Sequence, residues 1–234
     1  MASTTQRNPR PQLVTFSGID GAGKSTQISA IHSRLSEAGI KVRLLAFWDD
    51  VAALAWAREF LSHALFKGEK GVGSPERPVL RRDKNVRSWY MTASRFALYF
   101  LDALRLSAVV GGLSVRNDAD VVIFDRYLYD ELANLDLSNA ISRAYVRFLL
   151  KLVPHPDFAC LLDADPARAH ARKPEYGLDF VRSNRASYLA LSIFAGGITV
   201  IPPLAAEEVT RRVLQAISQR LLGIPRLLPQ SPHQ

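Results

Sequence analysis

The sequence predicts an α/β protein with a five-stranded parallel sheet covered by helices on both faces. Five short apolar segments alternate with segments of helical periodicity, and no internal repeat is present. A glycine-rich turn follows the first apolar segment directly and leads into the first helix. Aspartates follow the second, third and fourth apolar segments, as is typical where parallel strands end at one functional edge of a sheet.

The strands are predicted from apolar runs and from the turn residues around them. The third and fourth runs are unbroken, as expected for strands at the centre of a parallel sheet, and two prolines introduce the fourth. The predicted strands are Leu13–Phe16, Lys41–Phe47, Val121–Phe124, Phe158–Leu162 and Ile198–Ile201.

Helices are predicted where apolar residues recur every three or four positions. The long third helix is apolar on nearly all sides, which predicts burial on several sides, and Gly111-Gly112 is expected to end it. A loop rich in glycine and proline, from Lys67 to Pro78, precedes that helix. The predicted helices are one that ends at Gly39, then Val51–Phe66, Val86–Val110, segments between Tyr129 and Val153, one that ends at about Phe194, and Ala205–Leu222.

Composition indicates one cytosolic domain that binds an anionic ligand. The 234 residues carry a net charge of +8, which favours polyanionic partners, but no run of interleaved aromatic and basic residues predicts nucleic acid binding. The lone Cys160 excludes a disulfide framework and a cysteine metal site. Because Asp102 and Arg105 interrupt the longest apolar stretch, we expect no membrane span.

We predict a disordered leader over 1–11, a single domain over 12–223 and a flexible tail over 224–234.

The glycine-rich turn fits the pattern G-x-x-x-x-G-K-[ST], the phosphate-binding loop or P-loop. Its glycines permit backbone angles that let successive N–H groups converge on phosphate oxygens at the start of a helix. Lys24 can then reach the β and γ phosphates of a nucleotide, and the Ser25 hydroxyl is placed to bind Mg²⁺. The predicted ATP-binding residues are Gly18, Asp20, Gly21, Ala22, Gly23, Lys24, Ser25 and Thr26.

Two further motifs, Asp125-Arg126-Tyr127 after the third strand and Leu162-Asp163-Ala164-Asp165-Pro166 after the fourth, complete a resemblance. Together with the P-loop, and in the same order, they make the chain resemble the thymidylate kinase family of P-loop kinases over most of its length. The resemblance implies a nucleoside monophosphate kinase fold with a short basic lid over about 165–180. It implies an ATP- and Mg²⁺-dependent cytosolic enzyme of nucleotide biosynthesis that converts dTMP to dTDP, and a homodimer formed through the long helices.

The resemblance also implies roles for single residues. Asp20 would face the sugar of the acceptor nucleotide, Asp125 would lie near Mg²⁺, Arg126 would bind phosphate, and Arg95 would contact the acceptor. In the lid, basic residues would close over the transferred group, and Lys24, Asp125, Arg126 and Arg172 form the predicted catalytic set. The lid residues are Arg168, Arg172 and Arg185. Phe180, Arg185 and Tyr188 fit the family's F-x-x-x-V-R-x-x-Y helix.

The chain departs from the family's pattern on the acceptor side. Where the family has an R-E-P-G-G-type segment after the second strand, this chain has Phe47-Trp48-Asp49-Asp50, whose carboxylates would repel a phosphate. Met91, with Tyr90 beside it, replaces the aromatic residue that stacks on thymine, and Ala133-Asn134-Leu135 replaces A-Y-Q. The predicted acceptor-binding residues are Asp20, Asp49, Tyr90, Met91, Arg95 and Arg126.

Two alternatives to a dTMP kinase stay open from the sequence. A P-loop kinase with a hydroxyl acceptor, such as a deoxynucleoside, would use Asp49 or Asp50 as general base, a group that a phosphate acceptor does not need. The other is a nucleotide-binding protein without turnover. The absence of an N-K-x-D motif weakens a GTPase switch, and a basic lid would have no purpose in a protein that only binds.

Overall fold

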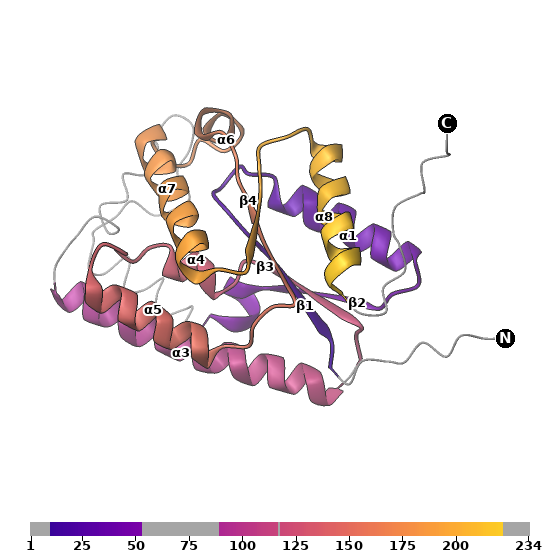
Figure 1. Ribbon diagram of the computed structural model, residues 1–234, viewed down its shortest axis with the longest axis horizontal. Coiled ribbons are helices and arrows are strands. Elements are labelled where there is room, and N and C mark those ends of the chain that lie inside the picture. The colour runs from indigo at the N-terminus through magenta and orange to yellow at the C-terminus, as the bar shows by residue number, and fades with distance from the viewer. Residues whose placement is uncertain (1–9, 53–88, 117, 222–234) are drawn as a thin grey trace.

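A computed structural model describes residues 10–52, 89–116 and 118–221 of the chain. Its five strands form one parallel sheet in the order β2-β3-β1-β4-β5, with helices on both faces, which confirms the predicted fold class (Figure 1). The strands are β1 (Gln12–Ser17), β2 (Val42–Ala46), β3 (Val121–Asp125), β4 (Phe158–Leu162) and β5 (Ile198–Ile201). The helices are α1 (Lys24–Glu37), the π-helical turn η1 (Phe47–Val51), α3 (Trp89–Arg116), α4 (Leu128–Leu132), α5 (Ala140–Leu152), α6 (Pro166–Arg172), α7 (Leu178–Ala195) and α8 (Ala206–Arg220).

Alternating residues of the central strands supply two hydrophobic cores, one on each face of the sheet. On one face Val14 and Phe16 of β1 pack with α1 and α8, and on the other Leu13 packs with α3, α4, α5 and α7. The core side chains on both faces are nearly all fully buried, including those of β3 and β4. This double burial explains why these strands read as unbroken apolar runs in the sequence.

The register of the sheet brings the ends of three strands together. Phe16 at the end of β1 pairs with Asp125 at the end of β3, and Ser17 pairs with Leu161 near the end of β4. The loops that follow β1, β3 and β4 therefore leave the sheet at one edge, where ligands bind in open parallel sheets. These three loops carry the three motifs identified in the sequence.

The prediction that Gly111-Gly112 ends the long helix is wrong, because α3 continues to Arg116. Neither glycine has a positive φ, and a methyl group on either one would meet no neighbour within 4 Å. Leu113, just after the pair, is 4% exposed and anchors the last turn in the core. A glycine inside a helix costs about 1 kcal/mol relative to alanine, and core packing beyond the pair outweighs that cost.

The long helix is also less buried than its composition predicts. Leu101, Leu104 and Val115 are 41%, 43% and 86% exposed, so α3 presents an apolar stripe to solvent on one side. Its segment Ala93–Arg116 is long and apolar enough to cross a membrane by length and composition, with 33% of the most apolar window buried. Core helices of soluble proteins meet the same criterion, and α3 packs on α4 and α5 through its buried side (Figure 1).

The second strand is shorter than predicted. Phe47 leaves the strand and begins η1, in which the Ala52 N–H donates to the Phe47 carbonyl at 2.7 Å. The predicted helix Val51–Phe66 and the loop to Pro78 lie outside the described residues from 53 onward, as do residues 1–9 and 222–234. The described chain begins at Arg10, just before β1. The Arg10 guanidinium pairs with Asp157, the residue before β4. The predicted domain bounds stay predictions.

Candidate active site

The loop between β1 and α1 has the backbone geometry that its glycines were predicted to provide. Gly18, Gly21 and Gly23 have φ values of 141°, 80° and 92°. Two of them also lie against neighbouring backbone: a Cβ on Gly18 would be 2.5 Å from the Leu162 carbonyl oxygen, and one on Gly21 would be 2.3 Å from that of Ala169. Ala169 belongs to α6, so this helix packs directly on the loop between β1 and α1.

Lys24 is the first residue of α1, and its side chain points back into the loop between β1 and α1. Its Nζ donates to the carbonyl oxygens of Gly18 at 2.7 Å and Ile19 at 3.0 Å, and the residue is 7% exposed. Burial and, to a smaller extent, the nearby Arg126 lower the pKa of Lys24 to about 8, against the opposing effect of three aspartates. A cation that lies among backbone carbonyls at the start of a helix is placed to exchange them for phosphate oxygens.

Arg126 lies between two carboxylates at the end of β3. Its Nη1 donates to Asp130 Oδ1 at 3.0 Å, and its Nη2 forms a short ion pair with Asp20 Oδ1 from the P-loop. Burial works against ionisation of Asp20, but Arg126, Lys24 and Lys173 hold the pKa of this carboxyl below its ordinary value. The structure thus brings together two predicted site residues, Asp20 and Arg126, across a sequence separation of 106 residues.

Asp125, the acid predicted to lie near Mg²⁺, ends β3 beside Phe16 of β1. Its Oδ1 atom is buried and has no hydrogen-bond partner in the described part of the chain. A buried carboxylate oxygen without a donor is a site for a cation, because leaving it unpaired is costly. The exposed Ser25 follows Lys24 in the first turn of α1, at the same edge of the sheet.

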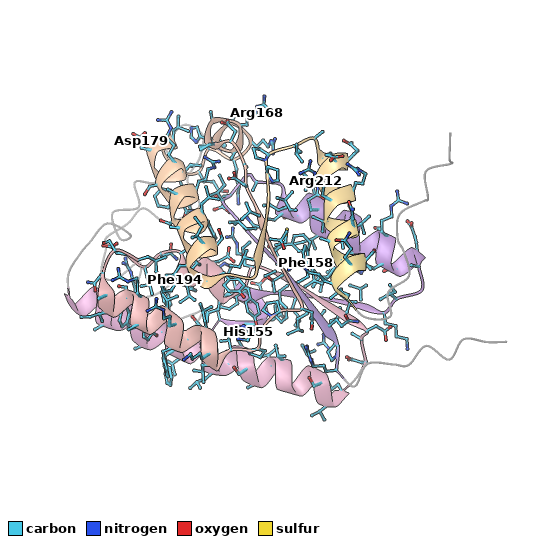
Figure 2. The ribbon with its side chains drawn as sticks, in the orientation of Figure 1. His155, Phe158, Arg168, Asp179, Phe194 and Arg212 are labelled. Carbon is cyan, nitrogen blue, oxygen red and sulfur yellow. The ribbon has the colours of Figure 1, made fainter. Side chains whose placement is uncertain are left out.

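The three predicted lid arginines have different surroundings. Arg172, at the end of α6, donates from Nη1 to the Gly21 carbonyl oxygen at 3.1 Å, so it contacts the P-loop. Arg168 is exposed at the outer side of α6 (Figure 2). Arg185 on α7 forms a bidentate pair with Asp163, at 2.6 and 2.7 Å. Of the three, only Arg172 touches the P-loop in this arrangement.

Arg95 lies on α3, in an environment it shares with the buried Tyr99 and Glu131. Burial raises the pKa of Tyr99 well above its ordinary value, Glu131 raises it further, and the charge of Arg95 opposes both. Glu131 is 3% exposed and belongs to α4, which begins three residues after Asp125. Tyr90 and Met91 lie in the first turn of α3, and their side chains are outside the described part of the structure.

The two aspartates after β2 differ in role. Asp50 Oδ2 accepts from the Ala46 N–H at 2.7 Å, so it links the end of β2 to the π-helical turn. Both aspartates are exposed. The hydrogen bond gives Asp50 a structural role, which a general base would have to leave, whereas Asp49 could act without disturbing the turn.

Sequence analysis missed one acidic residue at the centre of the site. Asp130 contacts Arg126, and also contacts Ser17 at the end of β1 and Tyr188 on α7. Its place shortly after the Asp125-Arg126-Tyr127 motif, as the third residue of α4, is the signal that could have drawn attention to it.

Comparisons with known proteins agree with the motifs. No protein-family model matches the chain. A probable thymidylate kinase of Pyrobaculum aerophilum is 27% identical, with 88% of this chain and 96% of the relative covered. A probable thymidylate kinase of Pyrococcus abyssi is 26% identical, with 92% and 100% covered. The crystal structure of thymidylate kinase from Ehrlichia chaffeensis superposes with a TM-score of 0.55 at 19% identity, covering 90% of this chain and all of the other. The predicted resemblance to the thymidylate kinase family is therefore confirmed: by the sequence relatives along most of the chain, and by the solved structure for the fold.

Proposed function

We propose that this protein transfers the γ-phosphoryl group of ATP to a nucleoside monophosphate, and that dTMP is the acceptor. The coarser part, an ATP-dependent nucleotide kinase, follows from the thymidylate kinase relatives. The observation that carries the proposal is the convergence of Lys24, Arg126 and Arg172 on one loop. Lys24 and Arg172 contact backbone carbonyls of that loop, and Arg126 pairs with its Asp20. Phosphoryl transfer depends mainly on such positioning and charge neutralisation.

On the donor side, the backbone N–H groups from Gly18 to Ser25 would surround the β and γ phosphates of ATP. Lys24 would exchange its two carbonyl contacts for phosphate oxygens, and bound phosphate would favour its protonated form. Arg172 reaches the loop from α6 and would bind the transferring group from the opposite side. Because both cations come from elements packed on the loop, their charges would already be in place as negative charge shifts in the transition state.

Ser25 and Asp125 fit a magnesium site, since one supplies a hydroxyl at the start of α1 and the other a buried oxygen without a donor. Bound Mg²⁺ would neutralise charge on the phosphates of the donor. The contribution of the protein would be to hold these two hard oxygen ligands at the edge of the sheet where the nucleotide phosphates would bind.

On the acceptor side, Arg126 would bind the phosphate of the nucleoside monophosphate, with Arg95 toward its base and Asp20 toward its sugar. A phosphate acceptor is already anionic at neutral pH, so its oxygen attacks without a general base. The hydrogen bond of Asp50 to the Ala46 N–H supports this choice over a hydroxyl acceptor only in that it gives one of the two exposed aspartates a structural role.

The test is release of ADP in a coupled assay with a panel of acceptors. The proposal expects dTMP to stimulate ADP release at least tenfold above thymidine and above other nucleoside monophosphates. Stimulation by thymidine or another hydroxyl compound, abolished by Asp49→Asn, would favour the deoxynucleoside kinase. Tight ATP binding with no turnover on any acceptor would favour a binding protein.

We also propose that the protein is a cytosolic homodimer formed through α3. The exposed Leu101, Leu104 and Val115 on this helix, beside the 51% exposed Phe148 of α5, supply an apolar surface. Light scattering on the purified protein tests this assembly. Leu104→Glu should convert a dimer into a monomer without loss of helical content, and a wild-type monomer would exclude it.

A further inference from the structure

The carboxylate of Asp130 is buried and fully occupied by donors. Its side chain is 2% exposed. Oδ1 accepts from Arg126 Nη1 at 3.0 Å and from the Tyr188 hydroxyl at 2.7 Å. Oδ2 accepts from the Ser17 hydroxyl at 2.6 Å and from the Tyr127 N–H at 3.1 Å. Four donors satisfy the carboxylate, so it has no remaining role as a ligand for a substrate or a metal.

Burying a charged group in this way is unfavourable unless the group is paired and hydrogen-bonded, and removal of one partner leaves an uncompensated charge. The donors to Asp130 come from β1, from the loop after β3 and from α7, so the residue joins three elements at the edge of the sheet. An arrangement of this kind holds its cationic partner in one position.

That partner, Arg126, has an unusual backbone. Its φ is 69°, the one positive value among non-glycine residues in the described ranges. An L-residue rarely adopts this conformation, and it persists only where the surroundings determine it. Burial would lower the pKa of Arg126, but Asp130 and the other nearby acidic groups raise it, so the guanidinium stays charged.

The two carboxylates that bind Arg126 differ in exposure. The Asp130 side chain is 2% exposed, whereas the Asp20 side chain is 29% exposed and comes from the P-loop. A dissolved anion can therefore approach the Nη2 side of the guanidinium, where Asp20 lies, but not the Nη1 side. A guanidinium binds carboxylate and phosphate with the same planar donors, so one can replace the other.

We propose that Asp130 is a positioning residue that fixes Arg126 through Nη1, and that the phosphate of the acceptor replaces Asp20 on the Nη2 side. This inference rests on the proposed function, since it assigns a geometry to acceptor binding in the same site. Asp20 then occupies the place of the phosphate until the acceptor binds, and Asp130 stays in place throughout.

The experiment measures kcat and KM for dTMP in Asp130→Asn, with Asp102→Asn as the matched control. Asp102 is also a buried carboxylate, 0% exposed, but it lies on α3, and its charge acts on Tyr145 of α5 rather than being among the charges that act on Arg126. Asp130→Asn should raise KM for dTMP at least tenfold and change the affinity for ADP by less than threefold. Asp102→Asn should change both by less than threefold. Equal KM values in the two variants would overturn the inference, because loss of a buried charge would then be the whole effect.

A second arm uses sulfate as a competitor of dTMP at saturating ATP. Asp20→Asn should lower the inhibition constant of sulfate at least threefold, because a fixed anion no longer competes for Nη2. An unchanged or higher constant would contradict the exchange of Asp20 for phosphate. This arm also decides the matter if Asp130→Asn does not fold. Absence of wild-type turnover with every nucleoside monophosphate would overturn the proposed function and this inference together. If the wild type turns over dTMP, the proposed function stands, and the variants then test this inference alone.

Discussion

The proposed donor end and the proposed acceptor end of this site differ in the atoms that make their contacts. Around the P-loop, backbone atoms make the contacts: glycines lie against the Leu162 and Ala169 carbonyls, and Lys24 and Arg172 bond to carbonyls of the loop. Toward the acceptor, charged side chains meet in pairs, as Arg126 does with its two aspartates. Backbone geometry tolerates few sequences, whereas ion pairs can be exchanged. This difference is consistent with a chain whose donor motif matches the family and whose acceptor motifs depart from it.

The largest expected effect separates the two ends directly. Lys24→Ala should cut turnover by roughly 10² or more, because it removes a charge that stabilises the transferring group. Arg126→Ala should cut turnover by a similar factor, but by weakening the binding of the acceptor. The KM for dTMP should therefore rise, while the affinity for ADP is retained. Steady-state kinetics and ADP titration distinguish them, and near wild-type rates in either variant would contradict the assignment.

A methyl group on Gly21 tests whether the packing of α6 on the P-loop is needed for ATP binding. Gly21→Ala would place Cβ 2.3 Å from the Ala169 carbonyl oxygen, so either the loop or α6 must move. We expect KM for ATP to rise tenfold or more. Gly39→Ala is the control, since Gly39 has a similar φ of 79° but open space around it. That variant should lose only about 1–2 kcal/mol of folding stability from backbone strain, and a matching effect on KM would refute the packing argument.

Lys24 also gives the donor end a characteristic dependence on pH. Its folded pKa of about 8 lies below the value of an unfolded lysine, so the unfolded chain binds the extra proton above pH 8. Burial of the charge destabilises the fold at low pH, and this penalty is lost as pH rises through 8. The free energy of unfolding should therefore rise by about 1 kcal/mol from pH 7 to 9 in wild type relative to Lys24→Met. Urea unfolding of the nucleotide-free proteins measures this difference, and parallel pH profiles would contradict it.

The smallest effect concerns the acceptor end. Asp50→Ala removes the acceptor for the Ala46 N–H and should lower the free energy of unfolding by about 1 kcal/mol with turnover retained. Asp49→Ala should change stability by less than about 0.5 kcal/mol. Thermal unfolding and the coupled assay measure both variants. If Asp49→Ala abolished turnover instead, the acceptor would be a hydroxyl compound and the phosphate-binding role of Arg126 would fail.

The fold and the backbone conformation of the P-loop could be predicted because their signals are local. The P-loop is contiguous in sequence, and the burial of β3 and β4 appears as unbroken apolar runs. The end of α3 could not be predicted, since the turn after Gly111-Gly112 depends on the packing of Leu113 against distant residues. Asp130 stands close to a recognised motif, but its contacts could not be predicted, because its donors include Tyr188, 58 residues away. Likewise, no local pattern could show that Arg185 would pair with Asp163.

The amine of Lys24 has a consequence for chemical labelling. With a pKa of about 8, roughly a tenth of it is unprotonated at pH 7, far more than of an ordinary surface lysine. An unprotonated amine is a nucleophile, so a nucleotide analogue that carries an electrophile at its terminal phosphate position would acylate or sulfonylate this lysine selectively. Its position inside the loop restricts access to reagents shaped like the natural triphosphate, which makes Lys24 a site for covalent inhibitors.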